Sequence, residues 1–242
     1  MIESCFKFDS LLCGQPLVYS ECARVIPCGV CGKTDETQVA CRDGHFVCDR
    51  CHAAPANDLI EKVCIASPAT DPVTLAIGLM KLPQVKMHGP EHYFLVPTVL
   101  LAAYYNIKGG SPDKAVQIWQ ARKRAENVLG GFCGFYGACG AGVGTGIYIS
   151  LITDSTPLAV EAWALSNAIT ARSPAVIAAH GGSRCCKRDS FLALQAAVEL
   201  LREHFSIHLD VQEPVLCEFS HFNRESLLDG CPFHIQESEQ LA

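Results

Sequence analysis

The stretch Gly130-Gly-Phe-Cys-Gly-Phe-Tyr-Gly-Ala-Cys-Gly-Ala-Gly-Val-Gly-Thr-Gly146 organises the chain, and it carries two cysteines, Cys133 and Cys139. Nearly half of its residues are glycine, and no charged residue occurs between Glu126 and Asp154. Because glycine loses more backbone entropy on folding than other residues, such a density requires close backbone approach or positive φ angles. Three explanations are open: a cradle for a cluster or cofactor, a tightly packed helix, or a mobile loop. The stretch has neither the dinucleotide fingerprint nor the Gly-Lys-Ser/Thr end of a phosphate-binding loop, which weakens a nucleotide cradle.

The composition predicts a folded protein with one sizeable core and a small appendage. The chain has 242 residues, 15 cysteines, 18% charged residues and a formal net charge of -6. This charge gives no reason to expect nucleic acid or an anionic membrane as a partner. The N-terminus does not have the layout of a signal peptide and no uninterrupted apolar run reaches membrane-spanning length, so we expect a cytoplasmic protein without a membrane span.

The cysteines are better interpreted as metal ligands or redox-active thiols than as a disulfide framework, because their number is odd and no secretion signal precedes them. Some are expected to be small buried hydrophobic residues instead. We favour that interpretation for Cys5, Cys13 and Cys22, and leave it open for Cys64.

Two Cys-x-x-Cys pairs predict a structural zinc site. Cys28 and Cys31 are separated from Cys48 and Cys51 by 16 residues, which is a spacing typical of four-thiolate zinc centres. Cys41 and His45 lie between the pairs and are further candidate ligands.

These six residues resemble the first six ligands of a RING finger, although the last Cys-x-x-Cys pair of that family is missing. A single zinc knuckle or a treble-clef-like module fits the missing pair better. Zinc binding would supply folding energy to this segment.

After residue 57 the pattern is typical of α-helices. Four helix starts are indicated by a capping residue followed by proline, at Asp71-Pro72, Ser111-Pro112, Thr156-Pro157 and Ser173-Pro174. Two nearly all-apolar segments, about 94–106 and 157–171, are expected to form the buried centre. The predicted fold is therefore mainly α, with a small N-terminal zinc-knuckle module. Its predicted parts are an arm and zinc module (1–55), a helical body (56–210) and a C-terminal extension packing on the body (211–242).

The segment Met-His88-Gly-Pro-Glu91-His92 places two imidazoles and a carboxylate at a helix entrance. The order matches a metallopeptidase pattern, but glycine and proline between the histidines disfavour the continuous helix that this chemistry needs. Two interpretations stay open. The three side chains are either a capped helix start with satisfied histidines, or catalytic proton donors and ligands near a metal.

The last predicted helix begins with a further cysteine-containing motif, Gly-Gly-Ser-Arg184-Cys185-Cys186-Lys187-Arg188. Three cations and a helix N-terminus should lower the pKa of both thiols and favour thiolate. We therefore expect Cys185 and Cys186 to be nucleophiles or ligands, with two buried structural cysteines as the alternative.

Four of these motifs together resemble a Cys-rich domain family of unknown function from methanogenic archaea and anaerobic bacteria. They are Gly-His-Phe-Val-Cys-Asp-Arg-Cys-His, Met-His-Gly-Pro-Glu-His, Gly-Ala-Cys-Gly-Ala-Gly and Gly-Gly-Ser-Arg-Cys-Cys-Lys-Arg, and the resemblance covers about residues 26–234. The family has His-His where this chain has His92-Tyr93. The resemblance implies a setting in anaerobic one-carbon or sulfur metabolism, with methyltransferase-like or radical-type partner proteins.

From these patterns we expect a redox or sulfur-handling protein, acting as an enzyme or as a metallocofactor maturation factor. An iron–sulfur cluster or reactive thiol centre would be held by Cys133, Cys139, Cys185 and Cys186, with Gly137 and Gly140 close to it. One alternative is a thiol enzyme without a cluster, using Cys185 or Cys186 with His88 or His92 as base. A second alternative is a zinc-stabilised scaffold protein of a methyl-transfer or redox complex.

Overall fold

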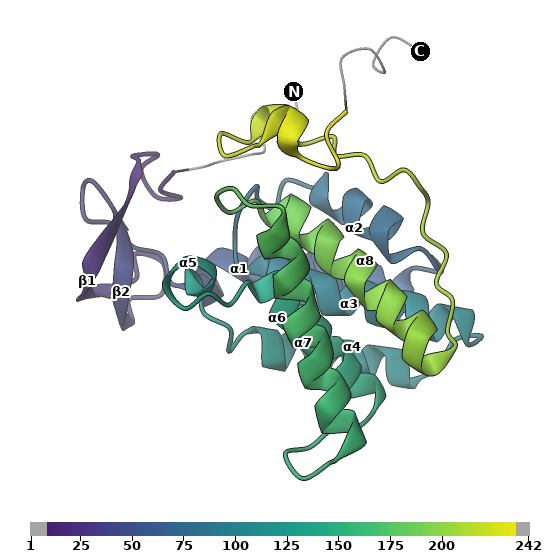
Figure 1. Cartoon of the computed structure of the whole chain (residues 1–242). Helices are drawn as coiled ribbons and strands as arrows, with labels where there is room; N and C mark the ends of the chain where they lie inside the picture. The colour runs from purple at the N-terminus through teal and green to yellow at the C-terminus, as the bar shows by residue number, and fades with distance from the viewer. Residues whose placement is uncertain (1–8, 236–242) are drawn as a thin grey trace.

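The computed structural model describes residues 9–235, and most of this range is α-helical. A two-stranded antiparallel hairpin lies to one side of the helices, and the C-terminal segment crosses their upper end in Figure 1. The strands are β1 (Leu17–Pro27) and β2 (Thr34–Cys41). The helices are α1 (Asp49–Ala66), α2 (Pro72–Met80), α3 (Glu91–Ile107), α4 (Asp113–Ala125), α5 (Phe132–Phe135), α6 (Gly140–Ile152), α7 (Glu161–Ala179) and α8 (Cys186–Phe205). This arrangement confirms the predicted mainly α class with a small Cys-rich N-terminal part.

Helix α3 is the centre of the helical body. It is buried without a break from Glu91 to Tyr104, and it contacts α1, α2, α4, α6 and α8. A helix that is apolar on nearly every side is stable only when other helices surround it. The prediction of a buried segment over 94–106 is confirmed for all but its last two residues.

The glycines of α6 allow this helix to pack closely on both neighbours. A Cβ atom on Gly142 would lie 2.7 Å from ring carbons of Pro174 in α7, and one on Gly144 would lie 2.9 Å from Cδ of Pro97 in α3. Neither distance leaves room for a side chain unless the neighbour moves. Of the three explanations for the glycine stretch, close helix packing accounts for its second half.

The predicted helix starts differ in their outcome. Asp71 caps α2 as expected, since its carboxylate accepts the N–H groups of Val73 and Thr74 at 2.8 and 3.1 Å. The start predicted at Ser173-Pro174 is wrong, because both residues lie inside α7. The Ser173 hydroxyl lies 3.0 Å from that of Thr145, so it does not cap a helix. The missing side chain of Gly142 leaves room for the proline ring.

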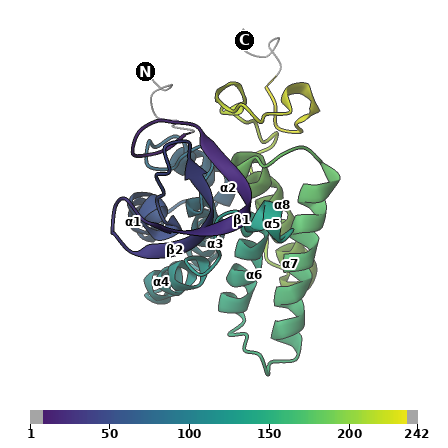
Figure 2. The same cartoon turned by 90° about the vertical axis from the view of Figure 1, so that its left-hand side faces the viewer.

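Helix α7 also corrects the prediction that 157–171 belongs to the buried centre. The helix begins only at Glu161, and within it only Ile169 and Ser173 are fully buried. It contacts α6 and α8 and forms the outer layer seen in Figure 2. Its exposed residues are mostly alanines, and exposing their small apolar area to water costs little free energy.

Helix α1 connects the hairpin to the helical body. It starts directly after Cys48, and its second half buries Ile60 and Cys64 in the core. The boundary predicted after residue 55 therefore lies inside one continuous helix. Within residues 9–235, no helix combines the length and the apolar character that crossing a membrane requires.

Candidate functional site

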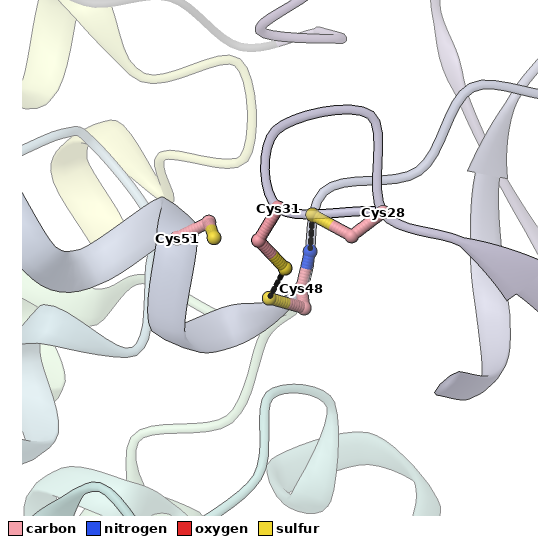
Figure 3. Close-up of side chains that lie close together, drawn as sticks. All are labelled: Cys28, Cys31, Cys48 and Cys51. Atoms are coloured by element: carbon pink, nitrogen blue, oxygen red, sulfur yellow. Dashed lines mark hydrogen bonds between the residues drawn. The ribbon is translucent and has the colours of Figure 1, made fainter. Parts of the chain in front are cut away.

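Cys28 and Cys31 of the turn between β1 and β2 converge with Cys48 and Cys51 at the start of α1, as Figure 3 shows. Their four sulfur atoms lie within 4.8 Å of one another, and those of Cys31 and Cys48 are 3.9 Å apart. Zinc–sulfur bonds of about 2.3 Å at the tetrahedral angle separate two sulfurs by about 3.8 Å. The predicted ligand set therefore has the spacing that one tetrahedral metal ion requires.

Backbone amides and burial set the charge of these thiols. Burial opposes ionisation of Cys28, but the amides of Cys31, Cys48 and Val30 outweigh it and lower its pKa to about 6. Burial and the three neighbouring thiols raise the pKa of Cys51 to about 12. Four thiols at this spacing can all ionise only beside a cation, so the donor set fits a thiophilic metal such as zinc.

Cys41 and His45 lie in a second cluster on the other side of the hairpin. The ligand atoms of Cys13, Cys41, Asp43 and His45 all lie within 4.8 Å of one another. Cys13 is exposed and does not fit the buried hydrophobic role expected from the sequence. Its separation of 28 residues from Cys41 gave no recognisable ligand spacing, and only the hairpin fold brings the two together.

The other cysteines outside the main candidates also differ from one another. Cys22 is exposed on β1, so its predicted burial is wrong. Cys64 is completely buried in the core and packs as a small hydrophobic residue. Cys5 lies outside the described residues.

A cavity of about 660 Å³ separates the hairpin from the helical body. This volume is typical of sites that bind small molecules. The hairpin contributes Tyr19, Val39 and neighbouring residues to its wall. The helical side contributes His52, His88, Tyr93, Cys133, Arg184 and Cys186.

Two of the predicted cysteines, Cys133 and Cys186, line the helical wall of this cavity, and Cys139 lies close to them. Cys133 lies in α5, Cys139 immediately precedes α6, and Cys186 begins α8. Burial raises the pKa of Tyr93, and negative charge on each of these three sulfurs raises it further. One phenol therefore lies within electrostatic reach of all three thiols.

Cys185 lies on the opposite side of the α8 N-terminus. Its sulfur accepts a hydrogen bond of 3.2 Å from the side-chain amide of Asn223. It lines a second, small cavity together with Cys217 and Cys231 of the C-terminal segment. The adjacent cysteines thus belong to two different surroundings.

The expectation that flanking cations lower the pKa of Cys185 and Cys186 is wrong. Burial raises the pKa of both thiols, and the carboxylate of Asp189 acts in the same direction. The guanidinium of Arg188 forms an ion pair with Asp189 at 3.1 Å, and the ammonium of Lys187 donates to a main-chain carbonyl oxygen at 2.9 Å. Arg188 and Lys187 are thus engaged elsewhere, and Arg184 lowers the pKa of Cys186 less than burial raises it.

The histidine–glutamate segment divides between the cavity wall and the core. His88 lines the cavity, and its Nε2 atom lies 3.0 Å from Oδ1 of Asn223. Glu91 and His92 are completely buried behind the wall. Burial lowers the pKa of His92 to about 3, so its ring is neutral, and Nδ1 lies 3.1 Å from the carbonyl oxygen of Gly89.

Glu91 holds the α3 entrance in place. Its carboxylate accepts the backbone N–H of Lys86 at 2.9 Å and lies 3.6 Å from Nδ1 of His52. Burial opposes its ionisation, but the interaction with His52 dominates and lowers the pKa of Glu91 to about 2. The structure thus reveals His52 as a residue that the sequence analysis missed, and its position next to Cys51 was the one available signal.

Gly137 and Gly140 have different roles around the thiols. Gly137 takes a φ of +66° in the turn before α6, a conformation that glycine adopts readily. Gly140 is the first residue of α6, and its Cα packs directly against the ring of Tyr93. Both glycines therefore position Cys139, which lies between them.

A family model described as a family of unknown function, DUF5714, matches residues 60–234. The match contains Cys133, Cys139, Cys185 and Cys186 and begins after the four-cysteine centre. No curated protein and no solved structure matches the chain.

Proposed function

The chain belongs to DUF5714, a family of unknown function, and for its activity we propose thiolate–metal chemistry in redox or sulfur metabolism. In this proposal Cys133, Cys139 and Cys186 hold an iron–sulfur cluster on the cavity wall. Zinc in the four-cysteine centre stabilises the hairpin that forms the opposite wall. The observation that carries the proposal is that Cys133 and Cys186, from separate segments, line one cavity, and that the sulfur of Cys139 lies within electrostatic reach of both.

The surroundings of these sulfurs suit a cluster. Backbone amides of Ala141 and Gly142 point at the sulfur of Cys139, and the amide of Gly89 points at that of Cys186. Amide hydrogen bonds to sulfur are among the groups by which proteins set the potential of a cluster. Cys139 also lies at the N-terminus of α6, where the helix dipole favours negative charge.

The cavity gives such a cluster access to a small substrate. Three protein thiolates leave one iron of a four-iron cluster without a protein ligand, and that position would face the cavity. Arg184 and His88 supply polar groups on the same wall, which suits an anionic substrate. Glu91 and His92, which the sequence suggested as catalytic, would instead hold the His88 loop and the α3 entrance from behind.

Metal and sulfide analysis of protein purified without oxygen tests this proposal. We expect iron and acid-labile sulfide in addition to zinc, and loss of iron in Cys186→Ser. The matched control is Cys185→Ser, which changes the adjacent residue on the other side of the α8 N-terminus and should keep its iron. A colourless protein that contains zinc alone, even after reconstitution with iron and sulfide, would refute the cluster.

The resemblance to proteins of anaerobic metabolism extends the proposal to its setting. We place the protein in the cytoplasm, in one-carbon or sulfur metabolism, where a reducing environment keeps thiols free. All cysteines of the described residues are free thiols, which agrees with such a compartment.

A second candidate function is that of an interaction or scaffold protein. It is favoured by three large apolar side chains at the tip of the α6–α7 hairpin: Leu158, Val160 and Trp163 are 93%, 83% and 51% exposed. Exposed apolar clusters of this kind are often protein contacts. This function predicts that Cys133→Ser leaves a partner complex intact, whereas Trp163→Ser weakens it.

A further inference from the structure

We propose that Cys13, Cys41 and His45 bind a second zinc ion, with Asp43 as the fourth ligand. The four residues lie at the open end of the hairpin, where β1 begins and β2 ends. Cys13 lies in the turn before β1, Cys41 is the last residue of β2, and Asp43 and His45 follow it in the next turn. Two sulfurs, one imidazole and one carboxylate are all ligands that zinc takes in proteins.

The distances fit one tetrahedral ion. The sulfurs of Cys13 and Cys41 are 3.7 Å apart, close to the separation of about 3.8 Å that two zinc–sulfur bonds impose. The Nδ1 atom of His45 lies 3.2 Å from the sulfur of Cys13. Because the Asp43 carboxylate also lies within 4.8 Å of the other three ligand atoms, all four can reach one ion.

The turn that carries these ligands has the same two kinds of hydrogen bond as the turn in the first centre, at different residue spacings. At Cys28, the amide of Val30 donates to the sulfur and the amide of Gly32 donates to the Cys28 carbonyl. At Cys41, the amide of His45 donates to the sulfur at 3.2 Å and that of Gly44 donates to the Cys41 carbonyl at 2.9 Å.

Both turns also have a glycine at positive φ, four residues after Cys28 and three residues after Cys41. Gly32 has a φ of +73° and Gly44 a φ of +82°, and no atom would crowd a Cβ at either position. Glycine is therefore present for its backbone conformation and not for space. Such a turn points an amide at a cysteine sulfur, and that amide stabilises a thiolate ready to bind a metal.

The second ion would fasten the segment before β1 to the end of β2. Asp9, Ser10 and Leu11, which line the large cavity, lie only a few residues before Cys13. A metal bond at Cys13 thus holds one edge of the cavity in place. This role is independent of any cluster at Cys133, Cys139 and Cys186.

Zinc content measured on the full-length reduced protein, by elemental analysis and native mass spectrometry, tests the second site. We expect two zinc ions per chain in the wild type and one in Cys13→Ser. The matched control is Cys22→Ser, which removes an exposed cysteine of the same hairpin that belongs to neither cluster and should keep both ions. His45→Gln should also lose one ion, and it replaces Cys13→Ser if that variant does not fold.

Cobalt substitution counts the sulfur ligands of each ion. With both sites filled, six thiolates bind cobalt, and Cys13→Ser should remove the sulfur-to-cobalt absorption of two of them, about a third of the total. Three outcomes would overturn the proposal: one zinc ion in the wild type, two ions in both Cys13→Ser and His45→Gln, or a Cys13–Cys41 disulfide in protein purified under reducing conditions. Iron content is measured separately, so a failure here leaves the cluster proposal untouched.

Discussion

The close contact between α6 and α3 makes a measurable prediction for Gly144→Ala. In the middle of a helix, alanine is more favourable than glycine by about 1 kcal/mol when the methyl group finds free space. At residue 144 the methyl carbon would lie 2.9 Å from Cδ of Pro97, 3.1 Å from the carbonyl oxygen of Tyr93 and 3.3 Å from Cβ of Val96. A backbone oxygen and a proline ring inside a helix cannot rotate away.

Overpacking of this kind costs about 1–3 kcal/mol. After subtraction of the gain in helix propensity, we expect Gly144→Ala to destabilise the protein by up to about 2 kcal/mol. The control is Gly78→Ala in α2, where no atom lies within 4 Å of the new methyl group and the propensity gain should appear undiminished. In a chain of this size, 1 kcal/mol shifts the melting temperature by about 2–4 °C.

Thermal unfolding followed by circular dichroism, with zinc present throughout, compares the two variants with the wild type. We expect the melting temperature to fall for Gly144→Ala and to rise for Gly78→Ala. If Gly144→Ala raises the melting temperature as much as Gly78→Ala does, the glycines of α6 are not packing residues, and the interpretation given above is wrong.

Three further predictions concern charge, metal and thiol reactivity. Because the pKa of Glu91 is lowered to about 2 in the folded protein, below the ordinary carboxyl value of about 4.3, the stabilisation from its ionised form should be present at neutral pH and be lost as the pH falls from about 4.3 to 2. In urea unfolding at neutral pH, Glu91→Gln should lower the free energy of unfolding by about 3 kcal/mol, and a loss that persists unchanged at pH 2 would contradict this reasoning. A zinc chelator should unfold the hairpin, so that the amides of residues 17–41 exchange hydrogen rapidly while those of α3 stay protected. Continued protection of the hairpin amides would argue against structural zinc. Alkylation of metal-free protein at neutral pH should modify the exposed Cys22 faster than Cys186, whose pKa is raised by burial, and equal rates would show that Cys186 is accessible and ionised.

The sequence was most informative where local chemistry decides the structure. The two Cys-x-x-Cys pairs predicted a ligand set that the hairpin assembles, and Asp71 predicted a helix start that its carboxylate caps. Both features depend on a few neighbouring residues. The apolar segment at 94–106 also predicted its own burial, because few other environments accept a helix that is apolar on every side.

Contacts between distant segments account for what the sequence could not show. Ser173-Pro174 has the composition of a helix start, but a glycine on another helix makes room for the proline inside α7. The cations beside Cys185 and Cys186 were expected to activate them, but Asp189 and a main-chain oxygen engage Arg188 and Lys187, and burial outweighs the effect of Arg184. Cys13 joins Cys41 and His45 only through the hairpin.

The continuous helix α1 determines how the metal-binding hairpin is rotated about the helix axis relative to the helical core. Its first turns carry Cys51 and His52, and its last turns bury Ile60 and Cys64. Successive residues of an α-helix are turned by about 100° around its axis. One residue inserted between His52 and Ile60 would therefore swing the whole hairpin by that angle, separate His52 from Glu91 and open the cavity, although every metal ligand and every core residue would still be present.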